Sequence, residues 1–130
     1  MVVRITPAQR QATRGHHPGM ERAVAISAPL VGSTGLYSAV VTTEPGGRTR
    51  IHHHGECETS IYVESGRARF SWGPTGLEET LVAEPGDFVY IPAGTIHVEE
   101  NASESEDLVV VLSRNCPDAV VFYLDDAAEG

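Results

Sequence analysis

Two short segments of the chain concentrate histidine, a side chain well suited to bind a divalent metal ion. Four of the six histidines lie in Ile51-His-His-His-Gly55 and Gly94-Thr-Ile-His97. In an extended strand, residues two apart project to the same face, so His52 and His54 can approach one ion while His53 points away. His97 supplies a third imidazole if its own strand lies beside the first. The sequence therefore predicts one divalent metal ion held by His52, His54 and His97.

The rest of the chain has the pattern of short strands separated by tight turns. Runs rich in Val, Ile, Tyr and Phe alternate with turn-forming clusters such as Glu44-Pro-Gly-Gly and Glu84-Pro-Gly-Asp87. Strands at this spacing are typical of a β-sandwich or barrel, and no long helical period competes with them. The expected strands are Ala23–Ala28, Leu36–Thr43, Thr59–Glu64, Arg67–Trp72, Glu79–Ala83, Phe88–Ile91, Leu108–Leu112 and Ala119–Leu124.

Alternation within these strands indicates which side chains face inward. Ala68, Phe70 and Trp72 share one side of their strand and are expected to line a largely apolar interior. The strands Phe88–Ile91 and Leu108–Leu112 are apolar on both faces, which suits coverage on two sides or the interface of a homodimer.

Length and composition limit the class of protein. With 130 residues and a net charge of −9, the chain is expected to form one domain that does not bind nucleic acid. No apolar run reaches the ~20 residues of a membrane span, and Cys57 and Cys116 form no CxxC pair, so we expect two unpaired, buried thiols in a cytoplasmic protein. We expect a flexible N-terminal arm over residues 1–20, containing His16 and His17, and a barrel over residues 21–130.

Around the metal-binding histidines, the sequence resembles the two motifs of the cupin family. The first comprises Gly47-Arg-Thr-Arg-Ile-His52-His-His54-Gly-Glu-Cys-Glu58, followed by Tyr62-Val63 and Gly66. The second is Gly86-Asp-Phe-Val-Tyr-Ile-Pro92-Ala-Gly94-Thr-Ile-His97-Val-Glu-Glu-Asn101, with every fixed residue at the family spacing. The resemblance covers residues 47–101 and implies an all-β cupin fold, a double-stranded β-helix or jelly-roll barrel with a metal ion between its two sheets.

The first motif departs from the family at its glutamate ligand. Counted back from Gly66, that ligand falls on Thr59, and Glu58 lies one residue earlier. Strand alternation places Glu58 on the opposite face from Thr59 unless a bulge reorients it. Glu58 is thus the candidate fourth metal ligand, and the alternative is a three-histidine site completed by water or by Cys57.

Glu99 offers a second carboxylate. His97, Glu99 and Asn101 share one face by two-residue alternation, so Glu99 is expected to point towards the ion. Burial raises a carboxyl pKa and a cation lowers it, so Glu99 could serve as a fourth ligand or as a catalytic general base. The alternative is a strand end that twists and leaves Glu99 in solvent beside Glu100.

A metal ion with open coordination positions can act as a Lewis acid, activate water or bind dioxygen. These ligand types leave zinc, iron, manganese and nickel open. The resemblance implies a metal-dependent enzyme acting on a small carbonyl- or enol-containing substrate by cyclisation, isomerisation or lyase chemistry, as in polyketide-cyclase-like cupins. An Fe(II)-dependent dioxygenase and a non-catalytic small-molecule-binding cupin are the alternatives.

Overall fold

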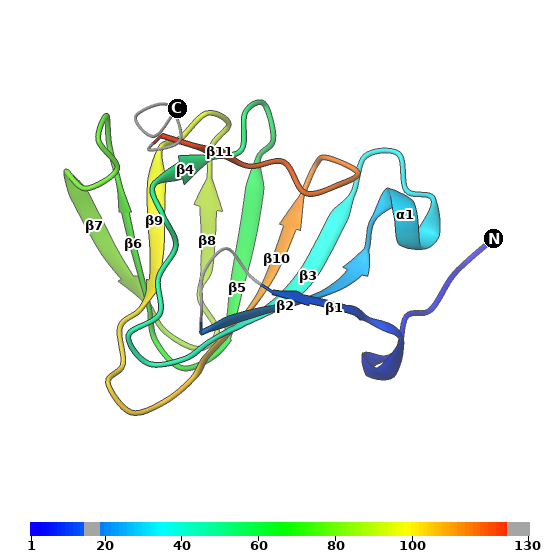
Figure 1. Ribbon diagram of the computed structural model, residues 1–130, viewed down its shortest axis with the longest axis horizontal. Helices are drawn as coiled ribbons and strands as arrows, with labels where there is room; N and C mark the ends of the chain where they lie inside the picture. The colour runs from blue at the N-terminus through cyan, green and yellow to red at the C-terminus, as the bar shows by residue number, and fades with distance from the viewer. Residues whose placement is uncertain (15–18, 125–130) are drawn as a thin grey trace.

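The central strands alternate between buried and half-buried residues, the pattern of sheets that cover a shared core. Tyr37–Thr43 and Leu108–Arg114 show this alternation along their full length because every second side chain turns inward. The computed structural model, which describes residues 1–14 and 19–124, folds the chain into two antiparallel sheets (Figure 1). The all-β class predicted from the sequence is confirmed.

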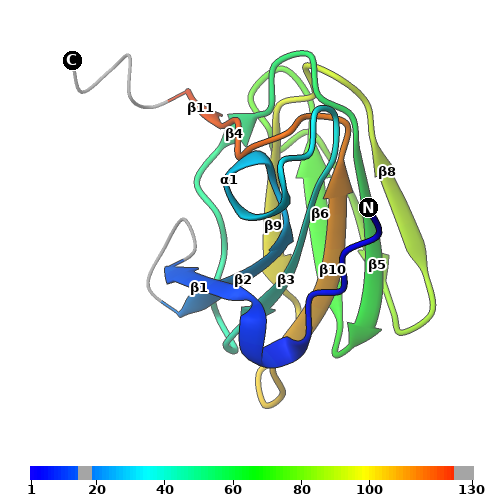
Figure 2. The same ribbon diagram turned by 90° about the vertical axis from the view of Figure 1, so that its right-hand side faces the viewer.

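Figure 2 shows β6 and β9 of the smaller sheet behind β10 and β5 of the larger one. No helix in the described part of the chain is long and apolar enough to cross a membrane. The helical segments are a 3₁₀ turn, Pro7–Gln9, and α1, Ala28–Val31. The larger sheet has the order β1 (Gln11–Arg14), β2 (Met20–Ile26), β3 (Tyr37–Thr43), β10 (Leu108–Arg114), β5 (Thr59–Ser65), β8 (Phe88–Ile91). The smaller sheet has the order β11 (Phe122–Tyr123), β4 (His52–His53), β9 (His97–Asn101), β6 (Ala68–Trp72), β7 (Glu79–Ala83).

Three strands lie outside the ranges expected from composition. β4 and β9 consist mainly of His, Glu and Asn, which do not mark strands by propensity. β1 falls in the segment expected to form a flexible arm, yet Gln11–Arg14 pairs with Glu21–Val24 at the edge of the larger sheet. The division at residue 20 stays a prediction, and His16 and His17 lie outside the described residues.

The two sheets enclose an apolar core. Ala68 and Phe70 are buried, as alternation predicted, while Trp72 is partly exposed. Gly66 has φ +86°, and a Cβ there would overlap the carbonyl oxygen of Asp107. Only glycine therefore fits where these two segments of the chain pass each other. The core residues are Val24, Tyr37, Ala39, Val41, Ile61, Val63, Ala68, Phe70, Ala83, Ile91, Leu108, Val110 and Leu112.

Cys57 and Cys116 form a disulfide, with their Cα atoms 5.9 Å apart. The prediction of two unpaired thiols is therefore wrong. The bond joins residues 59 positions apart, and it forms because β5 and β10, which pair Thr59 with Arg114, bring the flanking segments together. Pairing at this separation leaves no mark in the local sequence. By closing a long loop, the bond restricts the unfolded chain and stabilises the fold.

Candidate metal centre

Strand pairing in the smaller sheet brings the two histidine segments together. His52 of β4 lies directly opposite His97 of β9, and their ring centroids are 4.3 Å apart. The ring of His54, which follows β4, lies 4.8 Å from that of His52 and 5.3 Å from that of His97. All three side chains are buried. His53 stacks on Phe122 instead, so the structure brings together the three histidines selected by spacing and turns the fourth away.

A hydrogen bond from Nδ1 to a backbone carbonyl orients each of the three rings. A carbonyl oxygen only accepts hydrogen bonds, so Nδ1 carries the proton and the lone pair of the neutral ring lies on Nε2. Acceptors of this kind fix the tautomer and the direction of metal-binding histidines. Three Nε2 lone pairs are thus prepared to bind one ion. The acceptors are Arg50 for His52 (2.8 Å), Val120 for His54 (2.7 Å) and Thr95 for His97 (2.8 Å).

Glu99 adds a carboxylate to the three imidazoles. Its Oε2 atom lies 3.4 Å from Nε2 of His97 and 3.6 Å from Nε2 of His52, and one potential ligand atom from each of the four side chains lies within 4.8 Å of all the others. The backbone N–H of Glu99 donates to Oγ1 of Thr49, and its side chain is only 20% exposed. Glu99 therefore faces inward, as alternation along β9 predicted. The chain has a site for one divalent metal ion, with nitrogen and oxygen ligands.

The charges and the burial of the cluster favour a cation at its centre. Burial, together with the Arg114 guanidinium, lowers the pKa of His54 from 6.5 to about 3, so its ring is neutral at physiological pH. Burial also acts to lower the pKa of His97, but hydrogen bonding and charge from Glu99 outweigh it and raise that pKa. Burial acts to raise the pKa of Glu99, but the neighbouring His52 and His97 rings outweigh it and hold this pKa well below its usual value. A carboxylate facing imidazole lone pairs requires a proton or a metal ion between them.

Glu58 lies outside this cluster. Its side chain is exposed, and its carboxylate accepts hydrogen bonds from the Tyr90 hydroxyl at 2.6 Å and from Nδ2 of Asn115 at 3.1 Å. Thr59 is buried instead, because no register shift near the start of β5 changes the alternation. The expectation that Glu58 completes the ligand set is corrected, and the disulfide removes Cys57 as an alternative.

Arg114 is a residue of the site that the sequence analysis missed. It ends β10 opposite Thr59 and is 3% exposed. Its Nε donates to Oγ1 of Thr59 at 3.3 Å, and its Nη2 lies 3.3 Å from Nε2 of His54, where it donates to the ring lone pair. The available signal was a charged residue shortly after the apolar run Leu108–Leu112, within the same strand. The carbonyl of Val120, which orients His54, left no signal at all.

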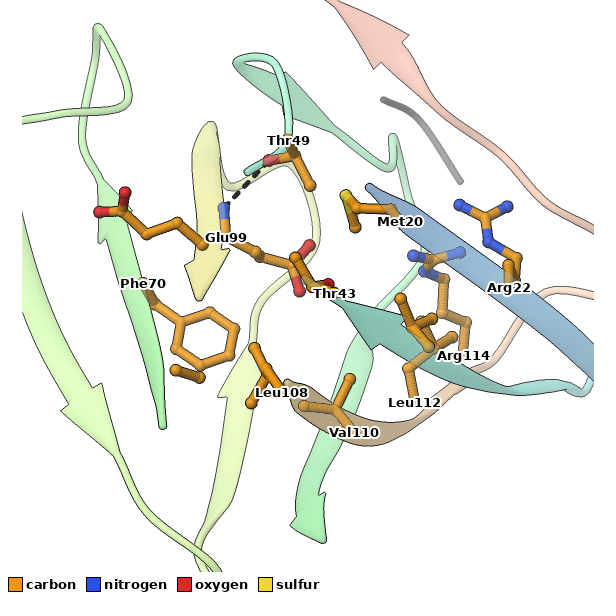
Figure 3. Close-up of a pocket in the computed structure, with 13 residues that line it drawn as sticks. Met20, Arg22, Thr43, Thr49, Phe70, Glu99, Leu108, Val110, Leu112 and Arg114 are labelled. Carbon is orange, nitrogen blue, oxygen red and sulfur yellow. Dashed lines mark hydrogen bonds between the residues drawn. The ribbon is translucent and has the colours of Figure 1, made fainter. Parts of the chain in front are cut away.

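Two pockets border the metal centre. The first has a volume of about 30 Å³ and contains Glu99 together with two arginines, Arg22 and Arg114 (Figure 3). The second has a volume of about 280 Å³, touches His97 and is mainly apolar, with Trp72 and Val89 in its wall. The site therefore has a small charged side and a larger apolar side.

The barrel fold and the histidine cluster place this chain in the class of metal-binding β-barrel proteins. The family model described as "Cupin domain" matches residues 39–113, more than half of the chain, and the chain belongs to the cupin family. The resemblance of residues 47–101 to the cupin motifs is thereby confirmed, as is the jelly-roll fold.

This chain matches only part of the length of each relative. A probable oxalate decarboxylase of Arthroderma benhamiae is 38% identical over 72 residues, which are 55% of this chain and 18% of that protein. Auxin-binding protein T85 of Nicotiana tabacum is 32% identical over 91 residues, 65% of this chain and 48% of that protein. Bacillus subtilis oxalate decarboxylase, in a structure from work on its Mn(II) centres, superposes with a TM-score of 0.74 at 28% identity, over 85% of this chain and 29% of that one. The chain thus spans less than half the length of each.

Proposed function

We propose that the chain is a metal-dependent enzyme that acts on a small organic substrate through a substrate oxygen bound to the ion, in lyase, isomerase or cyclase chemistry. One observation carries this proposal: three imidazoles with fixed tautomers and the Glu99 carboxylate surround one point. The similarity to proteins named oxalate decarboxylase favours the lyase form, and the Mn(II) centres of the Bacillus subtilis protein favour manganese among the four candidate metals.

Each residue of the site has a distinct part in this proposal. A bound divalent ion supplies Lewis-acid polarisation of the substrate oxygen. His52, His54 and His97 hold the ion with neutral nitrogens, which leaves its charge available to the substrate. Glu99 would help to hold the ion, and a carboxylate oxygen that the ion does not engage would accept or return a proton at the substrate. Its lowered pKa keeps the carboxylate ionised at neutral pH, the state required of a base. The apolar pocket beside His97 limits the access of water to the reacting atoms.

Elemental analysis of protein purified without added metal tests the proposal. We expect one equivalent of a divalent metal in the wild type and in His53→Ala, a matched control because His53 points away. The His52→Ala and His97→Ala variants should lose the metal. Absence of metal from the wild type, even after reconstitution, would contradict the proposal and leave a non-catalytic binding barrel.

Dependence on oxygen distinguishes the alternative enzyme class. An Fe(II)-dependent dioxygenase would use the same histidines and would consume dioxygen in proportion to product. The proposed lyase, isomerase or cyclase would form product without net consumption of dioxygen. Measurement of oxygen uptake with the metal-loaded protein decides between them.

We also propose a homodimer formed through an outer sheet face. Phe88 and Tyr90 on β8, an edge strand of the larger sheet, are 73% and 63% exposed, and large exposed apolar side chains on an edge strand favour association with another chain. A monomer mass at micromolar concentration would contradict the dimer.

The cytoplasmic location stays a prediction, and the disulfide argues against it because cytoplasmic thiols are usually kept reduced. Titration of the thiols in protein freshly released from cells tests the location. Two free thiols per chain would fit a cytoplasmic protein, and none would contradict it.

A further inference from the structure

We propose that Arg114 binds a carboxylate group of the substrate beside the metal ion, and that binding of the metal makes this carboxylate site available. The proposal rests on the proposed function and narrows it, because it assigns the substrate to the small organic carboxylates. Its basis is the arginine itself and the pocket that it lines.

Arg114 is a buried cation that forms no direct ion pair in the described part of the chain, although the Glu99 carboxylate lines the same pocket. Its side chain is 3% exposed, and its Nη1 atom has no hydrogen-bond partner in the described part of the chain. Its remaining contacts are the Thr59 hydroxyl, the His54 ring nitrogen and the Tyr37 ring, whose centroid lies 5.6 Å from Cζ. An arginine stays charged in a protein, and a buried charge with an unsatisfied donor is costly unless a ligand satisfies it. The unused donor is therefore a candidate ligand contact.

The pocket around Arg114 is positively charged once the metal is bound. Figure 3 shows Glu99 extending from β9 into this pocket, with the guanidinium groups of Arg22 and Arg114 on the other side. When Glu99 is a metal ligand, its charge is committed to the ion, and the Arg114 guanidinium then lies beside a divalent cation in a low-dielectric space. An anion is the group that such a space favours. The volume of about 30 Å³ exceeds the ~10–15 Å³ that one water molecule needs, which suits a single carboxylate group.

Metal binding releases a second donor of Arg114. In the metal-free protein, Nη2 donates to the Nε2 lone pair of His54. A neutral imidazole with a protonated Nδ1 has only this lone pair, so an ion bound to Nε2 must displace Nη2. Nη1 and Nη2 then form a free two-donor edge, the geometry that matches a carboxylate. The Nε bond to Thr59 keeps this edge beside the ion.

Thr59 explains why the arginine is left for a ligand. The cupin resemblance places a glutamate at this position, and a carboxylate there would neutralise Arg114 from within the chain. The threonine hydroxyl orients the guanidinium without cancelling its charge. A Thr59→Glu substitution should therefore fill the proposed site with an internal anion.

Titration of the metal-loaded protein with acetate tests the proposal. Acetate is a small carboxylate that chelates free metal weakly, and acetamide is its uncharged counterpart. With Co(II) in the site, acetate near the ion changes the visible absorption spectrum, and calorimetry gives the affinity. We expect saturable acetate binding to the wild type, none with acetamide, and weaker binding by about 10- to 100-fold in Arg114→Gln. Arg67→Gln is the matched control, because Arg67 is exposed and pairs with Glu84.

Several outcomes would overturn the proposal. Equal acetate affinity of Arg114→Gln and the wild type, with equal metal content, excludes Arg114 as the contact. Equal affinity of the metal-free and metal-loaded wild type excludes the release by metal. If Arg114→Gln fails to fold, Thr59→Glu gives the same test, since it should bind metal and no longer bind acetate. A wild type that binds no metal contradicts the proposed function, whereas a wild type that binds metal but shows no saturable acetate binding contradicts the Arg114 proposal alone.

Discussion

The two pockets at the metal centre differ in size, charge and construction. The charged pocket depends on contacts between distant parts of the chain, because Arg22, Glu99 and Arg114 come from β2, β9 and β10. The apolar pocket is built mainly by β6, β7 and β8, which follow one another in the sequence. A charged pocket with room for little more than one functional group favours recognition of that group, while an apolar pocket tolerates variation in shape. The comparison suggests one fixed reacting group attached to a variable apolar body.

The largest expected effect on the charged side of the metal centre is the loss of metal affinity when Glu99 is replaced. We expect Glu99→Gln to weaken metal binding at least about 100-fold, because a buried cation that loses its anionic partner costs roughly 3–5 kcal/mol. Competition with a metal-indicator dye measures the change. Glu100→Gln is the matched control, since Glu100 pairs with Arg69 outside the cluster at 3.5 Å. Equal metal affinity in Glu99→Gln and the wild type would remove Glu99 from the ligand set.

The disulfide lies on the same charged side, close to His54 and Arg114 in the sequence. Replacement of Cys57 and Cys116 together by serine should lower the free energy of unfolding by about 2–4 kcal/mol, because the unfolded chain regains the freedom of a long loop. Urea denaturation with and without reductant measures this. The reduced wild type should match the double variant, and an unchanged midpoint in both would contradict a stabilising bond.

Acid should destabilise the metal-free protein through the charged side. Burial lowers the pKa of His54 to about 3 in the folded state, from an ordinary value of 6.5 in the unfolded chain, so the unfolded chain binds this proton first. Stability should therefore fall as pH decreases from 6.5 towards 3, by up to about 1.4 kcal/mol per pH unit. Glu99, with its lowered pKa, acts in the same direction below 4.5, whereas the raised pKa of His97 adds stability that is present at low pH and lost as pH rises.

Urea denaturation at a series of pH values measures this slope. Loading with metal should make the protein more resistant in this range, because an ion on the Nε2 lone pair competes with the proton. His53→Gln serves as the control, since this ring lies outside the cluster. A stability that does not change between pH 6.5 and 4 would mean that His54 takes up its proton without cost in the folded protein.

The smallest expected effect concerns ligand binding in the apolar pocket. Val89→Phe should fill part of the apolar pocket and weaken the binding of benzoate by about tenfold, the cost of a group that no longer fits, while acetate binding stays unchanged. Val82→Phe on the exposed strand β7 is the control. Equal loss of both ligands would mean that the two pockets do not act separately.

Local spacing was enough to predict the histidines and most strands. His52 and His54 are two residues apart in an extended segment, so backbone geometry places them on one face. His97 was assigned from the resemblance to the second cupin motif, and its position beside His52 depends on the pairing of β4 with β9. Glu99 followed from the same alternation along β9. For the His52–His54 pair and for Glu99, the information lies within a few residues.

The features that sequence reasoning missed depend on pairing between distant segments. Arg114 reaches His54 and Thr59 only because β10 pairs with β5, and the disulfide depends on the same pairing. Glu58 shows a different limit, because a difference of one residue reverses the face of a strand. To predict which side chain faces the interior, its position in the alternation of the strand was a better guide than its residue type.

The carbonyl of Val120 has a consequence for the order of folding. It orients His54 from a segment far along the chain, while β4 pairs with β9 and Arg114 lies on a third strand. Contacts between residues so distant in sequence form slowly, since the loops between them must close first. During refolding, the ability to bind metal should therefore appear after most of the β-sheet signal. Metal uptake, followed in time, then reports the last step of assembly.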